Sequence, residues 1–321
     1  VGGATLRGFG GVVVPRPLLH LTTRKVLVME RVPGMKLVDG VMSSYEDIAA
    51  ERGMTLAELK REYARGGGAP GAGGKGAPAP SAAAISAARG LIRTRDFVSN
   101  LGIRARNMLL WLTHPPAPLV SSPLPLNAPA LVEALLAVHA HEIFEDGLFN
   151  GDPHPGNILL CPDGKLGLID YGQVKKLTLE QRLRIAELVV ALADGNREGV
   201  VDAYTRMGFR TAKMDHGVIH AHATIGFDTD DRSVTGGENI QKFFESLNKR
   251  DKTEHVPDFV VLPGRVAVLM RGLASLLQMP PLRVAEAWAP VCRRLLRRHK
   301  GDVEKIKSRP YPAMDPILDY S

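Results

Sequence analysis

The sequence predicts an α+β fold in which a few short strands lie beside a mainly helical C-terminal part. Two short apolar runs, Ile158–Cys161 and Leu166–Ile169, flank the turn signal Pro162–Lys165 and indicate a β-hairpin. Apolar residues recur at helical spacing before this hairpin, between Leu131 and Phe144, and further helical stretches follow it. We therefore expect short strands and a C-terminal part dominated by helices.

The composition is that of an ordinary globular protein. A chain of 321 residues allows one large domain or two modest ones, and its hydrophobic fraction of 45% argues against wholesale disorder. The two cysteines, Cys161 and Cys292, are too few for a disulfide framework or a zinc site and suggest a reducing compartment. The formal charge of +7 favours anionic partners such as phosphate groups or acidic lipid, although a solvated basic surface is the simpler interpretation. We predict no nucleic-acid partner.

Neither a targeting segment nor a membrane span is predicted. Val1–Gly11 is glycine-rich and lacks the cationic stretch followed by an apolar stretch of a signal peptide. The most apolar run, Val256–Met279, is interrupted by Asp258, Arg265 and Arg271. We therefore expect a chain that does not cross a membrane, although it could lie against one.

The first region, residues 1–62, combines strands with one helix. Val12–Val14 and Lys25–Met29 have the composition of strands, and Pro33–Gly34 marks a turn after the second strand. A helix is expected over Glu46–Glu62.

The second region, residues 63–129, is expected to be a basic insertion between two helices of one domain. Gly66–Ser81 consists mostly of Gly, Ala and Pro, which bury too little apolar surface to offset the entropy of ordering, so this stretch is predicted to be disordered. Within the region, a helix is expected only over Ile85–Leu112, where Arg-rich composition could attract acidic lipid. A solvated insert is the simpler alternative.

The third region, residues 130–321, contains the hairpin and most of the predicted helices. Gly147 ends the helix that begins near Leu131. Thr178 and Gln181 have the spacing of a capping box, and the helix that starts there should end near Gly195. Two more helices are expected, over Arg265–Gln278 and Arg283–His299.

Three oxygen-bearing side chains are predicted to converge at the base of the hairpin. Asp152 and Asn157 lie on one irregular loop, and Asp170 follows the second hairpin strand, which should fold it back beside Asn157. Carboxylate and amide oxygens are the hard ligands that Mg²⁺ prefers. Phosphoryl transfer requires this combination, because a metal bridges the phosphate oxygens while a carboxylate lies beside the attacking oxygen. The alternative is a turn that merely uses turn-forming residues.

The order of these residues is also that of a protein-kinase catalytic loop. An Asp is followed five residues later by Asn and then by a D-F-G segment, which here reads Asp170-Tyr171-Gly172. The stretch Asp152-Pro153-His154-Pro155-Gly156-Asn157 resembles the DPHPGN signature of the UbiB-type atypical kinases, and Val26–Gly34 resembles their interlobe hinge. The resemblance covers about 12–62 and 130–296.

The resemblance implies a protein-kinase-like fold, mainly its helical C-terminal lobe with the hinge strands. It implies that Asp152 is catalytic, that Asn157 and Asp170 bind Mg²⁺, and that Glu30 and Val32 face the adenine of ATP through their backbone groups. It further implies Mg-ATP-dependent phosphoryl transfer or ATP hydrolysis linked to quinone or isoprenoid-lipid metabolism. The partners would be ATP and a quinone precursor or another isoprenoid lipid, with peripheral contact with an anionic membrane, in a mitochondrion or plastid.

Two departures from the family bear on activity. The residues before Val12 contain neither the KxGQ segment nor the phosphate-pairing Lys of these kinases, so we expect residues 1–62 to hold a remnant of the N-terminal lobe. Only a few residues separate Gly172 from Thr178, where ordinary protein kinases hold a peptide substrate on a long activation segment. This shortness favours a small or lipid-associated acceptor, or ATP hydrolysis.

Two alternatives stay open. One is a small-molecule phosphotransferase of the aminoglycoside or choline kinase type, although Pro153 and Tyr171 favour the UbiB resemblance. The other is a non-catalytic, lipid-associated scaffold, because the N-terminal lobe is largely absent. The loop histidine, His154, is expected to be structural rather than a base.

Overall fold

The structure is a computed structural model that describes residues 11–59, 61, 81–111, 113–122, 124–277 and 279–311. These residues form two compact units. The larger unit comprises the described parts of Val1–Leu37, Leu131–Leu276 and Pro280–Ser321, and the smaller unit those of Val38–Ala130 and Leu277–Met279.

The larger unit contains a four-stranded sheet built around the predicted hairpin. Its order is β1 (Val12–Val13), β5 (Leu166–Leu168), β4 (Ile158–Leu160) and β2 (Met35–Lys36). β4 and β5 pair antiparallel, with Ile158 opposite Leu168, which confirms the hairpin. Gly164 adopts the left-handed conformation that this turn needs, with φ of 84°, because a side chain there would be strained.

A second ladder lies on the other side of the hairpin's loops. β3 (Leu148–Asn150) pairs antiparallel with β6 (Val174–Lys176). β6 occupies the short link between Gly172 and Thr178, so no long activation segment follows Gly172. A third, two-stranded ladder joins β7 (Arg210–Thr211) to β8 (Thr253–His255).

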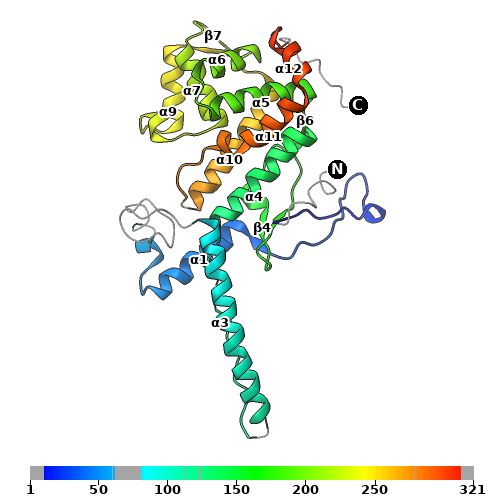
Figure 1. Ribbon diagram of the computed structural model, residues 1–321, viewed down its shortest axis with the longest axis vertical. Coiled ribbons are helices and arrows are strands. Elements are labelled where there is room, and N and C mark those ends of the chain that lie inside the picture. Colours follow the sequence, from blue (N-terminus) through cyan, green and yellow to red (C-terminus); the bar gives the residue numbers. More distant parts are fainter. Residues whose placement is uncertain are drawn as a thin grey trace. The chain divides into compact units, whose positions relative to one another are not determined.

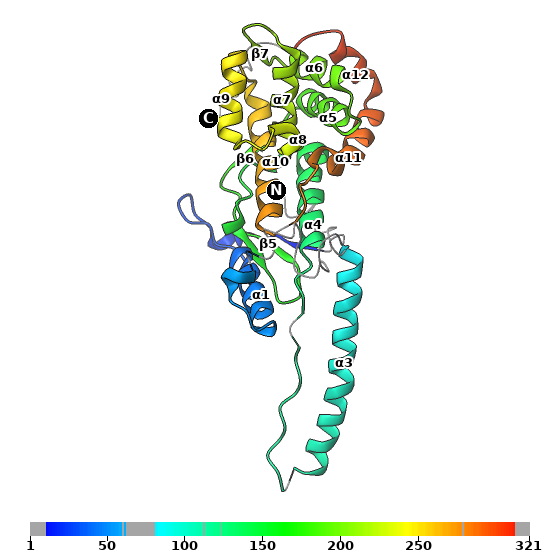
Figure 2. The same ribbon diagram turned by 90° about the vertical axis from the view of Figure 1, so that its left-hand side faces the viewer.

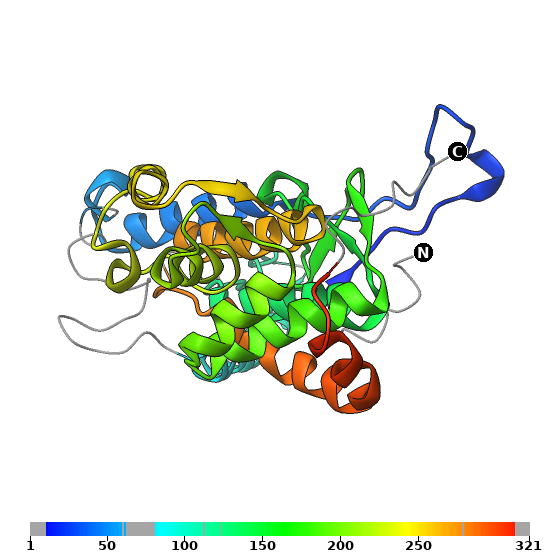
Figure 3. The ribbon, with the colours of Figure 1, turned by 90° about the horizontal axis from the view of Figure 1, so that it is seen from above.

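Helices make up the rest of the larger unit, as predicted, and the fold is a kinase-like α+β fold. α5 and α11 pack along each other, and α12 lies against α5, as the light green and orange-red helices of Figures 1 and 3 show. The helices are α4 (Ala128–Ala140), α5 (Leu179–Ala193), α6 (Arg197–Arg206), α7 (His216–Phe227), α8 (Arg232–Thr235), α9 (Ile240–Arg250), α10 (Asp258–Leu276), α11 (Val284–Arg298) and α12 (Lys300–Lys307).

Local signals placed several helix ends correctly. Thr178 and Gln181 form both hydrogen bonds of a capping box at the start of α5. α4 continues into a π-helical segment, His141–Asp146, which ends at the left-handed Gly147 as predicted. The predicted Arg265–Gln278 helix is longer than expected, because α10 already begins at Asp258.

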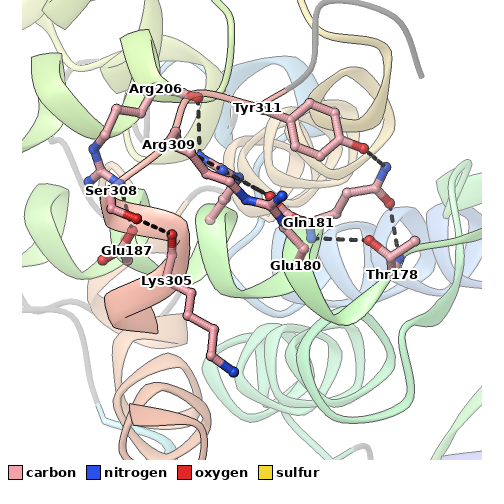
Figure 4. A network of polar contacts seen from close by, with 10 residues as sticks. Thr178, Glu180, Gln181, Glu187, Arg206, Lys305, Ser308, Arg309 and Tyr311 are labelled. Carbon is pink, nitrogen blue, oxygen red and sulfur yellow. Dashed lines mark hydrogen bonds and ion pairs between the residues drawn. The ribbon is translucent and has the colours of Figure 1, made fainter. Parts of the chain in front are cut away.

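Polar contacts tie α5 to the C-terminal end of the described chain, where Glu180 pairs with Arg309 and Gln181 donates to the Tyr311 hydroxyl (Figure 4). A buried arginine of α5 adds to them. Arg184 is 1% exposed, yet its charge is paired with Glu180 at 2.9 Å. It also donates to the backbone carbonyls of Arg206 at 3.2 Å and Arg309 at 3.0 Å, while its guanidinium lies 5.4 Å from the ring centre of Tyr311. A buried charge is tolerated only with such partners.

Two predictions about the N-terminal region are wrong. Lys25–Met29 is not a strand: only Met29 forms a bridge, to Pro17. Pro15 and Pro17 in the opposite leg of this turn lack the N–H groups that a ladder needs, so the pairing stays irregular. The helix predicted over Glu46–Glu62 is α1, which spans Leu37–Glu51 and ends before Gly53.

The smaller unit consists of α1, a helical stretch at 56–59 and the long helix α3 (Ala82–Leu109), which confirms the helix expected in the insertion. Ser81 caps α3 by accepting a hydrogen bond from the Ala84 N–H. The remainder of the stretch predicted to be disordered, 66–80, lies outside the described residues.

One helix among the described residues has the length and mean hydropathy, 1.6, of a membrane span: α10. However, 56% of its apolar window is buried inside the protein, as in a core helix. Arg265 and Arg271 of α10 form ion pairs with Asp152 and Asp230, so its interrupting charges take part in the fold.

A half-buried histidine should make the fold sensitive to acid. The His222 ring packs between Phe209 and Phe244, and desolvation lowers its pKa to about 4 from 6.5. Below pH 6.5 the His222 side chain is therefore protonated in the unfolded chain and still neutral in the folded chain. The stability that depends on the neutral ring is complete above pH 6.5 and decreases as the pH falls towards 4. Allowing for residual exposure of the ring, we expect a loss of about 2 kcal/mol.

The measurement is the free energy of unfolding between pH 7 and 4.5 for the wild type and for His222→Gln. The variant should lack most of this acid-dependent loss. His216→Gln is the control, because His216 is exposed on the same helix and should leave the pH dependence unchanged. An equal acid loss in the wild type and His222→Gln would contradict the prediction.

Candidate active site

The two loops that carry the predicted site residues lie side by side, because paired strands flank them at both ends: β4 with β5 and β3 with β6. The first loop, residues 151–157, runs from β3 to β4, and the second, residues 169–173, runs from β5 to β6. At one end the Ile169 N–H donates to the Asn157 carbonyl at 3.2 Å, and at the other the Gly151 N–H donates to the Gln173 carbonyl at 2.7 Å. The three predicted oxygen-bearing side chains are thus confined to one edge of the hairpin.

The structure brings Asn157 and Asp170 together. The Asn157 amide nitrogen donates to Asp170 Oδ2 at 2.8 Å, and the Gly172 N–H donates to Asp170 Oδ1 at 2.8 Å. The Asp170 side chain is exposed and Asn157 is half-buried, so both can be reached from solvent. Nitrogen and oxygen of an amide exchange places by rotation, so the same residues can present a carboxylate and an amide oxygen to one cation.

This pair fits Mg²⁺ better than a transition metal. Within the described ranges, no group of three or more His, Cys, Asp or Glu side chains could hold a metal ion. An amide oxygen with a single carboxylate leaves most positions of an octahedral ion for water and phosphate, which is how Mg²⁺ commonly binds beside nucleotides.

Asp152 is held by an arginine that the sequence analysis did not identify. Arg265 Nη2 of α10 lies 3.0 Å from Asp152 Oδ1, and Arg265 Nη1 donates to the Gln173 side chain at 3.3 Å. The contact with Asp152 is an ion pair without hydrogen-bond alignment, and Oδ1 accepts no hydrogen bond from the residues described. Arg265 therefore positions the Asp152 carboxylate. Oδ1 is buried against the arginine, and the side chain as a whole is 25% exposed, so solvent still reaches it. The feature of the sequence that could have pointed to Arg265 is its charge within the apolar run Val256–Met279.

Asn150 links the two loops through its buried side chain. Its amide nitrogen donates to the Asp170 carbonyl at 2.7 Å, and its amide oxygen accepts from the Asp152 N–H at 3.0 Å. With 5% exposure, this amide positions both aspartates at once. Sequence reasoning missed it, although a buried polar residue at the end of a strand is the kind of signal that indicates such a role.

Replacing Asn150 by Ala should destabilise the protein by about 2–3 kcal/mol. The change leaves the Asp170 carbonyl and the Asp152 N–H without partners in a partly buried place. Chemical denaturation of both proteins measures the effect. Asn248→Ala removes an exposed acceptor of a single hydrogen bond, from the Thr253 N–H, and should cost only a few tenths of a kcal/mol. A loss no larger in Asn150→Ala than in Asn248→Ala would contradict the proposed link.

A second buried network lies behind the Asp170-Tyr171-Gly172 segment. The Tyr171 hydroxyl donates to Glu142 Oε1 at 3.1 Å, and His139 Nδ1 lies 3.0 Å from Glu142 Oε2. His139 and Glu142 are 0% and 1% exposed. Burial, together with the nearby Glu142 charge, raises the pKa of Tyr171 well above its usual value of 10, so its hydroxyl stays a donor. The network fixes the residue that follows Asp170.

His154 has the structural role expected of it. Its Nδ1 accepts a hydrogen bond from the Gly156 N–H at 3.1 Å and caps the short turn Pro155–Asn157, while the side chain is exposed.

The two predicted hinge residues contact the N-terminal segment and β5. The Glu30 carboxylate pairs with Arg16, whose Nη2 is 2.7 Å from Oε1, and the Glu30 N–H donates to the Arg16 carbonyl at 2.9 Å. Val32 packs on β5: a Cβ added to Gly167 would lie 2.7 Å from Val32 Cγ1, so glycine is required there. Contact of Glu30 and Val32 with an adenine stays a prediction.

A hairpin whose two loops carry an aspartate each, with an asparagine five residues after the first, defines a kinase-like domain. Residues 123–204 match the family described as ABC1 atypical kinase-like domain. The match covers about a quarter of the chain, and it confirms the predicted likeness to the UbiB-type atypical kinases.

Three curated relatives from Arabidopsis thaliana agree with this assignment. ACTIVITY OF BC1 COMPLEX KINASE 3, chloroplastic, is 29% identical over 45% of this chain, and ACTIVITY OF BC1 COMPLEX KINASE 1, chloroplastic, is 34% identical over 42%. An uncharacterized aarF domain-containing protein kinase, also chloroplastic, is 25% identical over 45%. The matches cover only 20%, 19% and 21% of the relatives' own lengths.

Proposed function

We propose that this protein is an atypical kinase or ATPase that acts on Mg-ATP in the UbiB manner. The observation that carries the proposal is the direct contact between Asn157 and Asp170, with Asp152 tied to the same two loops through Asn150. When bound, Mg²⁺ would be held by Asn157 and Asp170 and would neutralise charge on the phosphate oxygens.

Other residues are proposed to act on the acceptor and on the adenine. Asp152 orients the attacking oxygen and accepts its proton, because its side chain is 25% exposed on the loop that also carries Asn157. Arg265 positions this carboxylate through the ion pair. Glu30 and Val32 would hold the adenine through their backbone groups, as the UbiB resemblance implies.

The acceptor is proposed to be a quinone precursor or another isoprenoid lipid, with ATP hydrolysis as the reaction when no acceptor is present. The short link filled by β6 supports this class, because no long segment follows Gly172 to hold a peptide. The chloroplastic names of the three plant relatives favour a plastid over a mitochondrion.

Thermal unfolding of the full-length protein tests the proposal. Mg-ATP should raise the Tm, whereas ATP with EDTA should not, because the metal pair is needed for phosphate binding. Phosphate release, measured with and without vesicles that contain a prenylated phenol, tests turnover and acceptor class. An unchanged Tm with Mg-ATP would overturn the enzyme proposal and favour a lipid-associated scaffold.

A further inference from the structure

The long helix α3 carries a row of polar side chains that form hydrogen bonds with the segment 113–122 of the same chain. The Asn100 side chain makes two hydrogen bonds with the Val120 backbone, at 2.8 and 2.6 Å, and Asn107 does the same with Ala117, at 2.9 and 2.8 Å. One turn earlier, Asp96 accepts from both the N–H and the hydroxyl of Ser122. The extended segment 113–122 is thereby fastened along one face of α3, as Figure 2 shows.

The opposite face of α3 is apolar and uncovered. At 3.6 residues per turn, the exposed large apolar side chains fall on the side away from Asp96, Asn100 and Asn107, whereas the half-buried isoleucines fall on the same side as these three. The former are all more than 60% exposed, and no residue of the helix is buried. This apolar face consists of Leu91, Phe97, Val98, Leu101, Met108 and Leu109. Because the segment 113–122 is held on the other side by paired hydrogen bonds, it cannot cover the apolar face without breaking them.

Arginines border the apolar face on both sides. Arg93 and Arg104 follow one edge and Arg95 and Arg106 the other, all exposed. Asp96 is the only acidic residue in α3, and both of its oxygens are engaged with Ser122. An apolar stripe between two cationic rows is the arrangement of a helix that lies flat in the headgroup layer of an anionic membrane, where arginine stems extend along the apolar surface and their heads reach lipid phosphates.

We propose that α3 binds the surface of an anionic lipid bilayer through its apolar face and its bordering arginines. A second copy of this chain fits less well, because two such faces in contact would place arginine rows against arginine rows. Trp111, 72% exposed just beyond the end of α3, adds an aromatic side chain of the type enriched at membrane interfaces. With 28 residues, α3 offers a contact about 42 Å long.

Vesicle binding by the full-length protein tests this surface without reference to catalysis. The probes are vesicles of phosphatidylcholine alone and of equal parts phosphatidylcholine and phosphatidylglycerol. The wild type should float with the anionic vesicles only. Phe97→Glu, Leu101→Glu and Met108→Glu together should weaken binding on the order of a hundredfold or more, because each change removes apolar insertion and adds repulsion. Leu19→Glu, Leu21→Glu and Leu27→Glu, three exposed apolar positions in the larger unit, form the matched control and should leave binding intact.

The contribution of the arginine rows is measured separately, through the strength of vesicle binding and its salt dependence. Each Arg near an anionic surface contributes about fivefold to binding, so Arg93→Gln, Arg104→Gln and Arg106→Gln together should weaken it on the order of a hundredfold and reduce its salt dependence. Glu and Gln are good helix formers, so circular dichroism should show unchanged helix content in both variants.

Tryptophan emission identifies the contact. The protein has two tryptophans, and Trp288 is fully buried, so a blue shift on vesicle binding reports Trp111. Trp111→Phe should abolish the shift while vesicle binding persists. Three results would overturn the proposal: no binding to anionic vesicles, wild-type binding by the triple Glu variant, or a blue shift that grows with protein concentration in the absence of lipid, which would indicate a second copy instead.

Discussion

Asp152→Asn should lower turnover about a hundredfold or more while Mg-ATP binding survives, and Asp170→Asn should weaken both. Loss of a positioned general base typically costs a factor of at least a hundred. Asp152 is tied to Arg265 and, through its N–H, to Asn150, and the Asn157–Asp170 contact does not involve its side chain. The neutral amide should therefore leave nucleotide binding in place.

Asp170 differs because its carboxylate belongs to the proposed metal pair. Its two oxygens accept hydrogen bonds from Asn157 and from the Gly172 N–H, so an amide in its place would turn one acceptor into a donor. Residues that merely support a metal ligand cost about 10–100-fold in metal affinity when removed, and loss of the ligand charge should cost at least as much. Asp170→Asn should therefore lose most of the Mg-dependent rise in Tm as well as turnover.

The two variants are measured by thermal shift with Mg-ATP and by phosphate release. Asp163→Asn is the matched control, since Asp163 is exposed in the hairpin turn and pairs only with Lys165 among the interactions in the described chain. It should bind and turn over like the wild type. Wild-type turnover in Asp152→Asn would eliminate Asp152 as the base, and full Mg-ATP binding in Asp170→Asn would separate Asp170 from the metal.

Features encoded within about a dozen residues were predictable from the sequence. The β4–β5 hairpin follows from two apolar runs around one turn, and the capping box of α5 follows from Thr178 and Gln181. The contact of Asn157 with Asp170 follows from that hairpin, because its strands end where these residues begin.

Features that depend on pairing between distant, short segments were not predictable. β3 and β6 are three residues each and carry no alternating pattern, so their ladder appears only when the two loops are placed. Arg265 reaches Asp152 from more than a hundred positions away in the chain, and its charge alone did not indicate a partner. The strand predicted over Lys25–Met29 does not form for a local reason: the prolines in the segment opposite it prevent a regular ladder of hydrogen bonds.

The contacts of Glu142 with Tyr171 and His139 were also not predictable from the sequence. Removing them should have the largest effect on stability. Glu142 and Tyr171 are 29 positions apart, and a Glu at the end of an amphipathic helix is ordinarily solvated. Here both carboxylate oxygens are occupied, one by the half-buried Tyr171 and the other by the buried His139. The π-helical turn directs this side chain inward, towards the base of the Asp170 loop.

Glu142→Ala should therefore destabilise the protein by about 3–5 kcal/mol, because it leaves the Tyr171 hydroxyl and the His139 ring without their shared acceptor. Tyr171→Phe should cost about 1–2 kcal/mol, since one hydrogen bond is lost and the ring is kept. In the double variant the two losses should overlap by about 1 kcal/mol, because both changes remove the same contact. Chemical denaturation of the four proteins measures this coupling.

The pH dependence gives an independent check on the same contact. The folded-state pKa of Tyr171 is raised above its unfolded value of 10, so the stability it contributes is complete below pH 10 and is lost as the pH rises further. Tyr171→Phe should remove this part of the alkaline loss, whereas Glu142→Gln should reduce it, because burial is the larger cause of the shift and the Glu142 charge the smaller. If Glu142→Ala costs less than 1 kcal/mol, or if Tyr171→Phe loses as much stability at alkaline pH as the wild type, the network does not support the Asp170 loop.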